Sequence, residues 1–207
     1  MRHTFLQSVA LRRSYYHLKN RTLVDDALVV KLVDELLAVM PSPFNVQSSR
    51  IVLLFEEQHR EFWHIVTRCL EQIVPCDKFD ATRNKIERAF SSGHGTILFY
   101  EDQASLDKLR EEFPLYADKV DVWSEQSSGM MQFAVWIGLE EFGYGASLQH
   151  YNPIIDKEVA DRWLIDKEWR LVAQMPFGEP LDVPAERKQR SLPHSRRKLF
   201  GAKEGIE

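Results

Sequence analysis

The segment at residues 126–142 constrains the fold most, because apolar side chains would cover most of its circumference if it forms a helix. A surface helix carries one apolar stripe, so a helix of this composition has to be buried by more than one neighbour. Gly143 and Gly145 follow the segment and are expected to end the helix.

The composition is that of one compact globular domain, with 207 residues, 44% hydrophobic, 28% charged and a formal net charge of −4. We expect a single domain over residues 1–207 that ends in a basic segment at 184–207. The negative net charge argues against nucleic acid as a partner. No apolar run approaches the roughly 20 residues that cross a bilayer, which argues against a membrane partner. Cys69 and Cys76 are too few for a disulfide framework, which favours a cytoplasmic location.

Periodicity indicates which segments form helices and strands. Two apolar runs, at 51–55 and 96–100, are typical of buried central strands, and alternation at 169–177 predicts a third. Helical spacing predicts helices at 4–14, 23–40, 57–74, 85–90, 104–113, 126–142 and 156–164. Because helices and strands do not alternate strictly, we expect an α+β fold with a small central mixed sheet wrapped by helices.

The usual catalytic signatures are missing from the chain. It has no GxSxG, Walker, HExxH or GxGxxG pattern. The seven histidines lack metal-ligand spacing, and His59 and His64, five residues apart, diverge on a helix. We therefore expect neither a metal site nor a covalent nucleophile.

Three groups of residues suit an anionic, planar ligand. Arg12, Arg13 and Ser14 offer guanidiniums and a hydroxyl that match a phosphate and a polar chain. Asn45 and Gln47, in the loop at 41–50, can donate to and accept from the edge of a heteroaromatic ring. A second basic pair, Lys188 and Arg190, lies near the C-terminus.

Each group also has a purely structural interpretation. Paired arginines at a helix C-terminus interact favourably with the helix dipole. Asn and Gln in a loop bounded by prolines form turns, and a basic tail is commonly solvated. Taken alone, these residues indicate an α+β domain with a candidate anion site.

Longer strings of the chain resemble the nitroreductase superfamily of FMN-dependent enzymes. The sequence RRS at 12–14 resembles the family's N-terminal motif, and PSPFNVQSSR at 41–50 resembles its Pro, Asn and Gln loop. The strings SLQHYNP and MPFG are similar to a subgroup of small fungal and bacterial nitroreductases linked by name to fatty-acid repression. The likeness runs in order from about residue 11 to residue 178.

The resemblance implies a nitroreductase-like, intertwined homodimer with two FMN molecules at the subunit interface, each contacted by both chains. The apolar helix at 126–142 suits a dimer core, because obligate interfaces resemble a domain core cut in half.

The resemblance also implies which residues bind FMN. The phosphate, ribityl chain and pyrimidine edge would be held by Arg12, Arg13 and Ser14, with Tyr16 beside them. Asn45 and Gln47 would reach the flavin from the partner subunit. Lys85 would lie near flavin N1 and O2, where a positive charge stabilises the anionic reduced flavin. A solvated helix lysine is an equally good interpretation of Lys85.

Two further segments are implied. After Gly145, whose lack of a side chain permits close approach to flavin N5, the family lines the flavin with residues that correspond here to Ser147, Leu148, Gln149 and His150. Lys188 and Arg190 match the family's phosphate-binding pattern, with Arg196 and Lys198 as alternatives. The superfamily often has Pro and Trp after the loop Gln. Ser48 and Ser49 stand there in this chain, so a ring-packing contact is lost or replaced.

The implied function is an FMN-dependent oxidoreductase that takes hydride from NADH or NADPH and reduces a nitroaromatic or a quinone by a ping-pong mechanism. The chemistry takes place on flavin N5, so we expect no catalytic side chain, His150 included. The alternative is a flavin-binding regulatory protein of lipid or redox response whose turnover is incidental.

Overall fold

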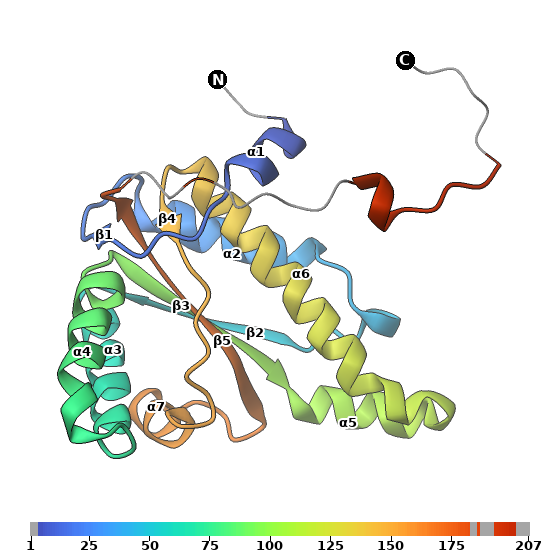
Figure 1. Ribbon diagram of the computed structural model, residues 1–207. Helices are drawn as coiled ribbons and strands as arrows, with labels where there is room; N and C mark the ends of the chain where they lie inside the picture. Colours follow the sequence, from blue (N-terminus) through green and yellow to red (C-terminus); the bar gives the residue numbers. More distant parts are fainter. Residues whose placement is uncertain (1–3, 183–185, 187–192, 202–207) are drawn as a thin grey trace.

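The computed structural model describes residues 4–182, 186 and 193–201 (Figure 1). The α-helices are α1 (Phe5–Leu11), α2 (Asp26–Val39), α3 (Glu56–Glu71), α4 (Cys76–Ile86), α5 (Gln103–Glu112), α6 (Val120–Glu141) and α7 (Asp156–Trp163). The strands are β1 (Leu18–Lys19), β2 (Ser49–Phe55), β3 (Gly95–Asp102), β4 (Gly145–Ala146) and β5 (Trp169–Pro180). Short helical turns lie at η1 (Pro43–Asn45), η2 (Glu87–Ser91), η3 (Pro114–Lys119) and η4 (Pro193–Arg196).

The α+β class is confirmed, with a small sheet in the order β1-β5-β3-β2 and β4 paired to β5. All pairings between these strands are antiparallel. The expected mixed sheet is therefore antiparallel among its named strands, and a parallel bridge joins Ser14 to Ala146 beside them. The apolar runs could not reveal this, because they show that a strand is buried and not which way it runs.

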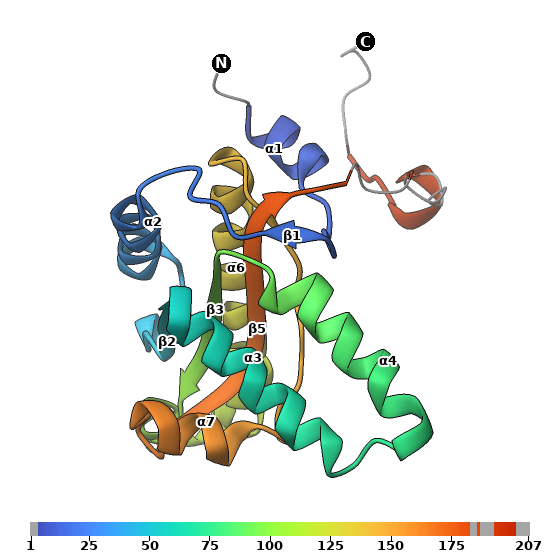
Figure 2. The same ribbon diagram turned by 90° about the vertical axis from the view of Figure 1, so that its left-hand side faces the viewer.

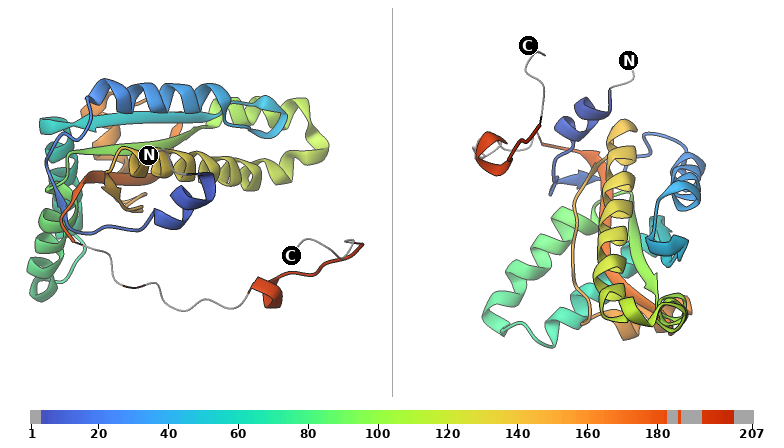
Figure 3. Two further views of the ribbon diagram at one scale, coloured as in Figure 1. Left: turned by 90° about the horizontal axis from the view of Figure 1, so that it is seen from above. Right: turned by 90° about the vertical axis from the view of Figure 1, so that its right-hand side faces the viewer.

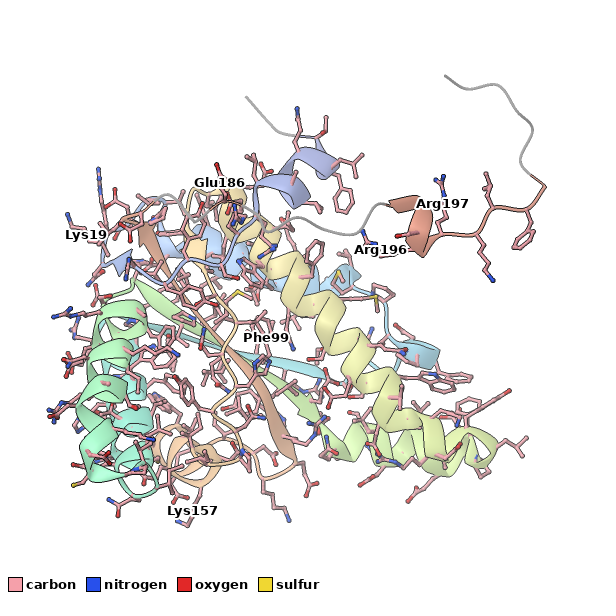
Figure 4. All side chains as sticks on the ribbon, viewed as in Figure 1. Lys19, Phe99, Lys157, Glu186, Arg196 and Arg197 are labelled. Atoms are coloured by element: carbon pink, nitrogen blue, oxygen red, sulfur yellow. The ribbon has the colours of Figure 1, made fainter. Side chains whose placement is uncertain are left out.

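Helices cover both faces of the sheet (Figure 2). Leu98 and Tyr100 of β3 belong to a core cluster with residues of α3, α4 and α7. Ile97 and Phe99 belong to the opposite cluster, with residues of α2 and α6, and Figure 4 shows Phe99 near the centre of the molecule. Successive side chains of a strand point to opposite faces, so β3 contributes to both clusters.

Two helices are longer than the sequence predicts. α6 begins at Val120 rather than at residue 126. Burial does not follow polarity in its first turns, where Ser124 is buried and Val122 is exposed, so no apolar period marked them as helical. The helix predicted at 85–90 is the end of α4, which continues into the π-helical turn η2. In the described part of the chain no helix is both long and apolar enough to cross a membrane.

Candidate functional site

The stretch 12–16 begins where α1 ends. Thr4 caps α1 through a reciprocal capping box with Gln7, which fixes the start of the helix. At its other end the Ser8 hydroxyl donates to the Glu141 carboxylate of α6. α1 therefore delivers Arg12, its C-terminal cap residue, against α6.

Arg12 lies against the aromatic ring of Trp136. Its guanidinium carbon is 4.2 Å from the centre of the ring. This distance is within the range of a cation–π interaction, which restrains the plane of the guanidinium. The charge of Arg12 is thus held at a defined place beside α6.

The next residues pair with the segment that follows α6. Ser14 forms a bridge with Ala146, and the Tyr15 amide donates to the Ala146 carbonyl at 3.0 Å. A Cβ atom on Gly145 would lie 2.8 Å from the Tyr15 ring, so the lack of a side chain there allows the two segments to meet. Burial, with the Glu140 carboxylate adding to it, raises the pKa of Tyr15 while Arg13 lowers it, so Tyr15 is neutral at pH 7.

Residues 147–150 then run along β5 as an extended segment (Figure 1). Gln149 exchanges two backbone hydrogen bonds with Gln174, at 2.7 Å and 2.9 Å, and its side chain donates to the Ser147 hydroxyl at 3.1 Å. Ser147 is fully buried, Leu148 and Gln149 are half-buried, and His150 is exposed. The sheet therefore fixes the path of the segment that the family resemblance places beside a flavin.

Lys85 lies near Tyr16, the last residue of the stretch 12–16. Tyr16, Lys85 and Arg88 line a shallow cleft of about 330 Å³ between this stretch and α4. Lys85 is exposed, with its amine 5.8 Å from the centre of the Phe90 ring. Residues 12–16 thus bring Lys85 and the segment after α6 to the same part of the molecule.

Asn45 and Gln47 lie elsewhere in the chain. Gln47 lines a small pocket with Ser127 of α6, nine residues before Trp136. At 1.5 Å per residue, these two levels of the helix are about 14 Å apart. Within one chain the amide loop therefore does not join Arg12, and its expected role toward the partner subunit stays a prediction.

The amide loop has an unusual backbone. Phe44, Asn45 and Gln47 have φ angles of 50°, 56° and 50°, in the left-handed region that side chains disfavour. Within the loop the Gln47 amide donates to the Ser42 hydroxyl at 2.9 Å, and its side chain donates to Asn45 at 3.3 Å. The sequence contains no glycine at these positions and gave no signal of this conformation.

The C-terminal basic residues fall into two pairs. Lys188 and Arg190 lie outside the described residues. Arg196 and Lys198, the alternatives, are exposed, and η4 stands apart from the helices and the sheet (Figures 3 and 4). The structure therefore does not bring the alternative pair to Arg12.

Titratable groups show no competing centre. Among residues 4–182, 186 and 193–201, no group of three His, Cys, Asp or Glu side chains could hold a metal ion. His59 is buried, accepts from or donates to Thr96 at 2.8 Å, and contacts the Ser91 carbonyl at 3.1 Å. Burial lowers the pKa of His59 to about 4, so this histidine is a neutral part of the core.

Sequence reasoning missed two features of the site. Arg12 and Trp136 are far apart in the chain, and no local pattern connects them. Glu101, at the end of an apolar run, is fully buried and accepts hydrogen bonds from three serines. Its place directly after the apolar run at 96–100 was the one local signal.

Known proteins are similar to this chain in sequence and in fold. The model of the Nitroreductase family matches residues 9–179. HBN1 of Saccharomyces cerevisiae is 30% identical over 188 residues, which cover 89% of this chain and 92% of that protein. Nitroreductase CinD from Lactococcus lactis in complex with nicotinic acid has a TM-score of 0.86 and 37% identity, covering 96% of this chain and 100% of CinD.

Further structures extend the comparison. CinD has also been solved in complex with chloramphenicol and with 4-nitrophenol, each 36% identical to this chain. A nitroreductase with bound FMN from Desulfitobacterium hafniense has the same fold at 13% identity, with a TM-score of 0.66 over 98% of this chain and 100% of that one. The protein described here belongs to the Nitroreductase family and is an oxidoreductase of that family.

Proposed function

We propose that this oxidoreductase is a homodimer that binds FMN and uses NADH or NADPH to reduce nitroaromatics or quinones. The observation that carries the proposal is the position of residues 12–16. Their Ser14 and Tyr15 pair with Ala146, and their Tyr16 shares a cleft with Lys85. Two arginines, a hydroxyl and a lysine are thereby placed around one stretch of backbone.

These residues fit FMN by their chemistry. A phosphate takes paired hydrogen bonds from a guanidinium, and Arg12 presents one that Trp136 restrains. The hydroxyl of Ser14 suits the polyol chain. Any side chain at position 145 would clash with Tyr15, so Gly145 keeps the two flavin-lining segments in contact.

The chain's own contribution is to bind, orient and balance charge. When bound, FMN supplies hydride transfer from a reduced nicotinamide to an acceptor. Lys85 provides a positive charge that offsets the negative charge gained in that reaction. His150 is exposed, and chemistry carried by the flavin requires no side-chain acid at this position.

Exposed apolar residues support the dimer. α6 has many buried residues, yet its Val122, Met130 and Phe133 side chains are 53%, 42% and 38% exposed. Phe5 and Leu6 of α1 are exposed as well. A second copy packed on α6 would remove this surface from water, and the proposal requires that it place the partner's amide loop near Arg12.

The ligands of CinD support the acceptor class. Chloramphenicol and 4-nitrophenol are both nitroaromatic compounds, and nicotinic acid has the ring of the nicotinamide donor. A ping-pong mechanism follows if donor and acceptor occupy the same slot in turn.

The test is a two-stage reaction under anaerobic conditions. Purified protein is loaded with FMN and mixed with NADH or NADPH, and then a nitroaromatic or quinone is added while the flavin absorbance is followed. We expect the donor to bleach the flavin, the acceptor to restore its colour, and steady-state double-reciprocal plots to be parallel. Bound flavin that reacts too slowly to sustain turnover would favour the regulatory role instead. Failure to bind FMN would overturn both.

A further inference from the structure

The amide loop needs an external support. Phe44, Asn45 and Gln47 all have left-handed backbone conformations, and none is a glycine. Such conformations persist where the surrounding structure over-determines them, and they are frequent at ligand-binding sites. The hydrogen bond from the Gln47 amide to Ser42 closes the loop on itself but does not attach it to the sheet.

Glu101 attaches the end of the loop to the sheet, beside the Arg50 guanidinium of β2, which donates to the Gln47 carbonyl at 2.8 Å. The Oε2 atom of Glu101 accepts from the Ser48 hydroxyl at 2.5 Å, and its Oε1 atom accepts from the Ser49 hydroxyl at 3.0 Å. Ser48 directly follows Gln47, is almost fully buried, and its carbonyl accepts from the Asp102 amide at 2.8 Å. The residue that follows the strained segment is therefore fixed on both its side chain and its backbone.

The carboxylate has a third donor on another element. Ser124 of α6 donates to the same Oε2 atom at 3.0 Å. Glu101 therefore joins the end of the amide loop, the end of β3 and α6 at one buried point. By the resemblance, Ser48 and Ser49 stand where the superfamily often has Pro and Trp, so this cluster would take the place of that ring-packing contact.

Burying the carboxyl group of Glu101 carries a desolvation penalty, so it is a poor means of stabilising the fold. Glu101 is fully buried, and in the described part of the chain no Lys, Arg or His lies within ion-pair distance of it. Burial raises the pKa of Glu101, while the three serine hydrogen bonds and the more distant Arg170 oppose that rise. A buried acidic group held by hydroxyls alone is weak evidence for added stability and fits a specific positional role better.

We propose that Glu101 is a positioning residue for flavin binding: through Ser48 it holds Asn45 and Gln47 in the left-handed conformation in which they contact the cofactor bound to the partner subunit. This inference rests on the proposed FMN function. It adds that the loop is prepared before FMN arrives.

Ser48→Ala and Ser124→Ala form a matched pair that tests the inference. Each variant removes one hydroxyl from the same carboxylate oxygen, but Ser48 alone continues into the amide loop. Two quantities are measured for each variant and the wild type: hydrogen–deuterium exchange at the Gln47 amide without flavin, and the Kd for FMN.

We expect Ser48→Ala to speed exchange at Gln47 and to raise the Kd for FMN, each by about tenfold. Ser124→Ala should leave both within about twofold of the wild type, even if its thermal stability falls as much. Glu101→Gln, whose amide still bonds to hydroxyls, should lie between the wild type and Ser48→Ala.

The possible outcomes distinguish a failure of the positioning role of Glu101 from a failure of the proposed FMN function. Equal effects of Ser48→Ala and Ser124→Ala, or no change at Gln47 in either, would overturn the positioning role. A different outcome is that Ser48→Ala speeds exchange at Gln47 but the wild type does not bind FMN. That result would overturn the proposed function, and with it the link from Glu101 to the cofactor.

Discussion

The guanidinium of Arg12 lies over the ring of Trp136, with its central carbon 4.2 Å from the ring centre. Arg12 caps the C-terminus of α1, and Trp136 lies in the second half of α6, so the contact also fixes how the two helices meet. A guanidinium held in one plane loses less freedom when it binds an oxyanion than one on a mobile side chain. In the proposed complex, this contact would prepare Arg12 for the phosphate of FMN.

Replacing Arg12 by alanine should therefore weaken the binding of FMN far more than that of riboflavin, which lacks the phosphate. Hydrogen bonds to charged groups contribute about 1.5–3 kcal/mol, so the Kd for FMN should rise about 10- to 100-fold. Titration of flavin fluorescence with both ligands measures the difference.

Arg21→Ala is the control for that substitution. Arg21 is an exposed arginine near the same stretch, paired with Glu179 at 2.7 Å. The Arg21→Ala substitution should leave the affinities for FMN and for riboflavin unchanged. Equal losses of FMN and riboflavin in Arg12→Ala would show that Arg12 supports the fold rather than the phosphate.

Lys85 should act on the redox properties of the flavin more than on its binding. A positive charge near the ring stabilises the reduced, more negative form. We expect Lys85→Met to make the two-electron midpoint potential about 30 mV more negative, a tenfold change in the ratio of affinities for the two forms. The shift should shrink in high salt, because Lys85 is exposed.

Lys78→Met provides the comparison, since Lys78 lies on the same helix but does not line the cleft with Tyr16. Spectroelectrochemical titration measures both variants. An unchanged potential in Lys85→Met would assign this lysine to the solvated surface of α4.

Stability should fall in mild acid because of His59. Its pKa of about 4 lies below the usual 6.5, so the unfolded chain binds a proton more tightly than the folded one. The stability is complete above pH 6.5 and is lost as the pH falls toward 4, by up to about 3 kcal/mol in total.

His59→Gln removes this titration and should flatten the dependence of the unfolding free energy on pH between 6.5 and 4. It should also lower the stability at pH 7, because Thr96 and Ser91 lose a partner. His64→Gln, on the exposed side of the same helix, should keep the wild-type slope. Denaturant titrations across this pH range measure all three proteins, and a wild-type slope in His59→Gln would contradict the account.

The sequence predicts the long elements well because their apolar residues repeat. The runs that became β2 and β3 and most of α6 are of this kind. The first nine residues of α4, at 76–84, escaped prediction because Phe79 and Ile86 are its buried residues and most of the others are polar. β1 and β4 have two residues each, too few to show any period.

The site divides in the same way. Arg12, Ser14 and the segment after Gly145 could be named from motifs, and the structure brings them together. Glu101 and Trp136 could not, because their importance comes from contacts with residues distant in the chain. The placement of Asn45 and Gln47 depends on a backbone conformation that propensities disfavour, and it is set by tertiary contacts.

In the proposed dimer, each FMN is held by Arg12 of one subunit and by the amide loop of the other. The most direct measurement is the flavin content of a purified heterodimer with two different tags. One chain carries Arg12→Ala and the other carries Asn45→Ala with Gln47→Ala, at an FMN concentration where neither variant alone retains flavin. The account predicts one intact site, and so one FMN, in each heterodimer, because the two undamaged halves face each other. A heterodimer without flavin would contradict it, since each chain would then build its own site.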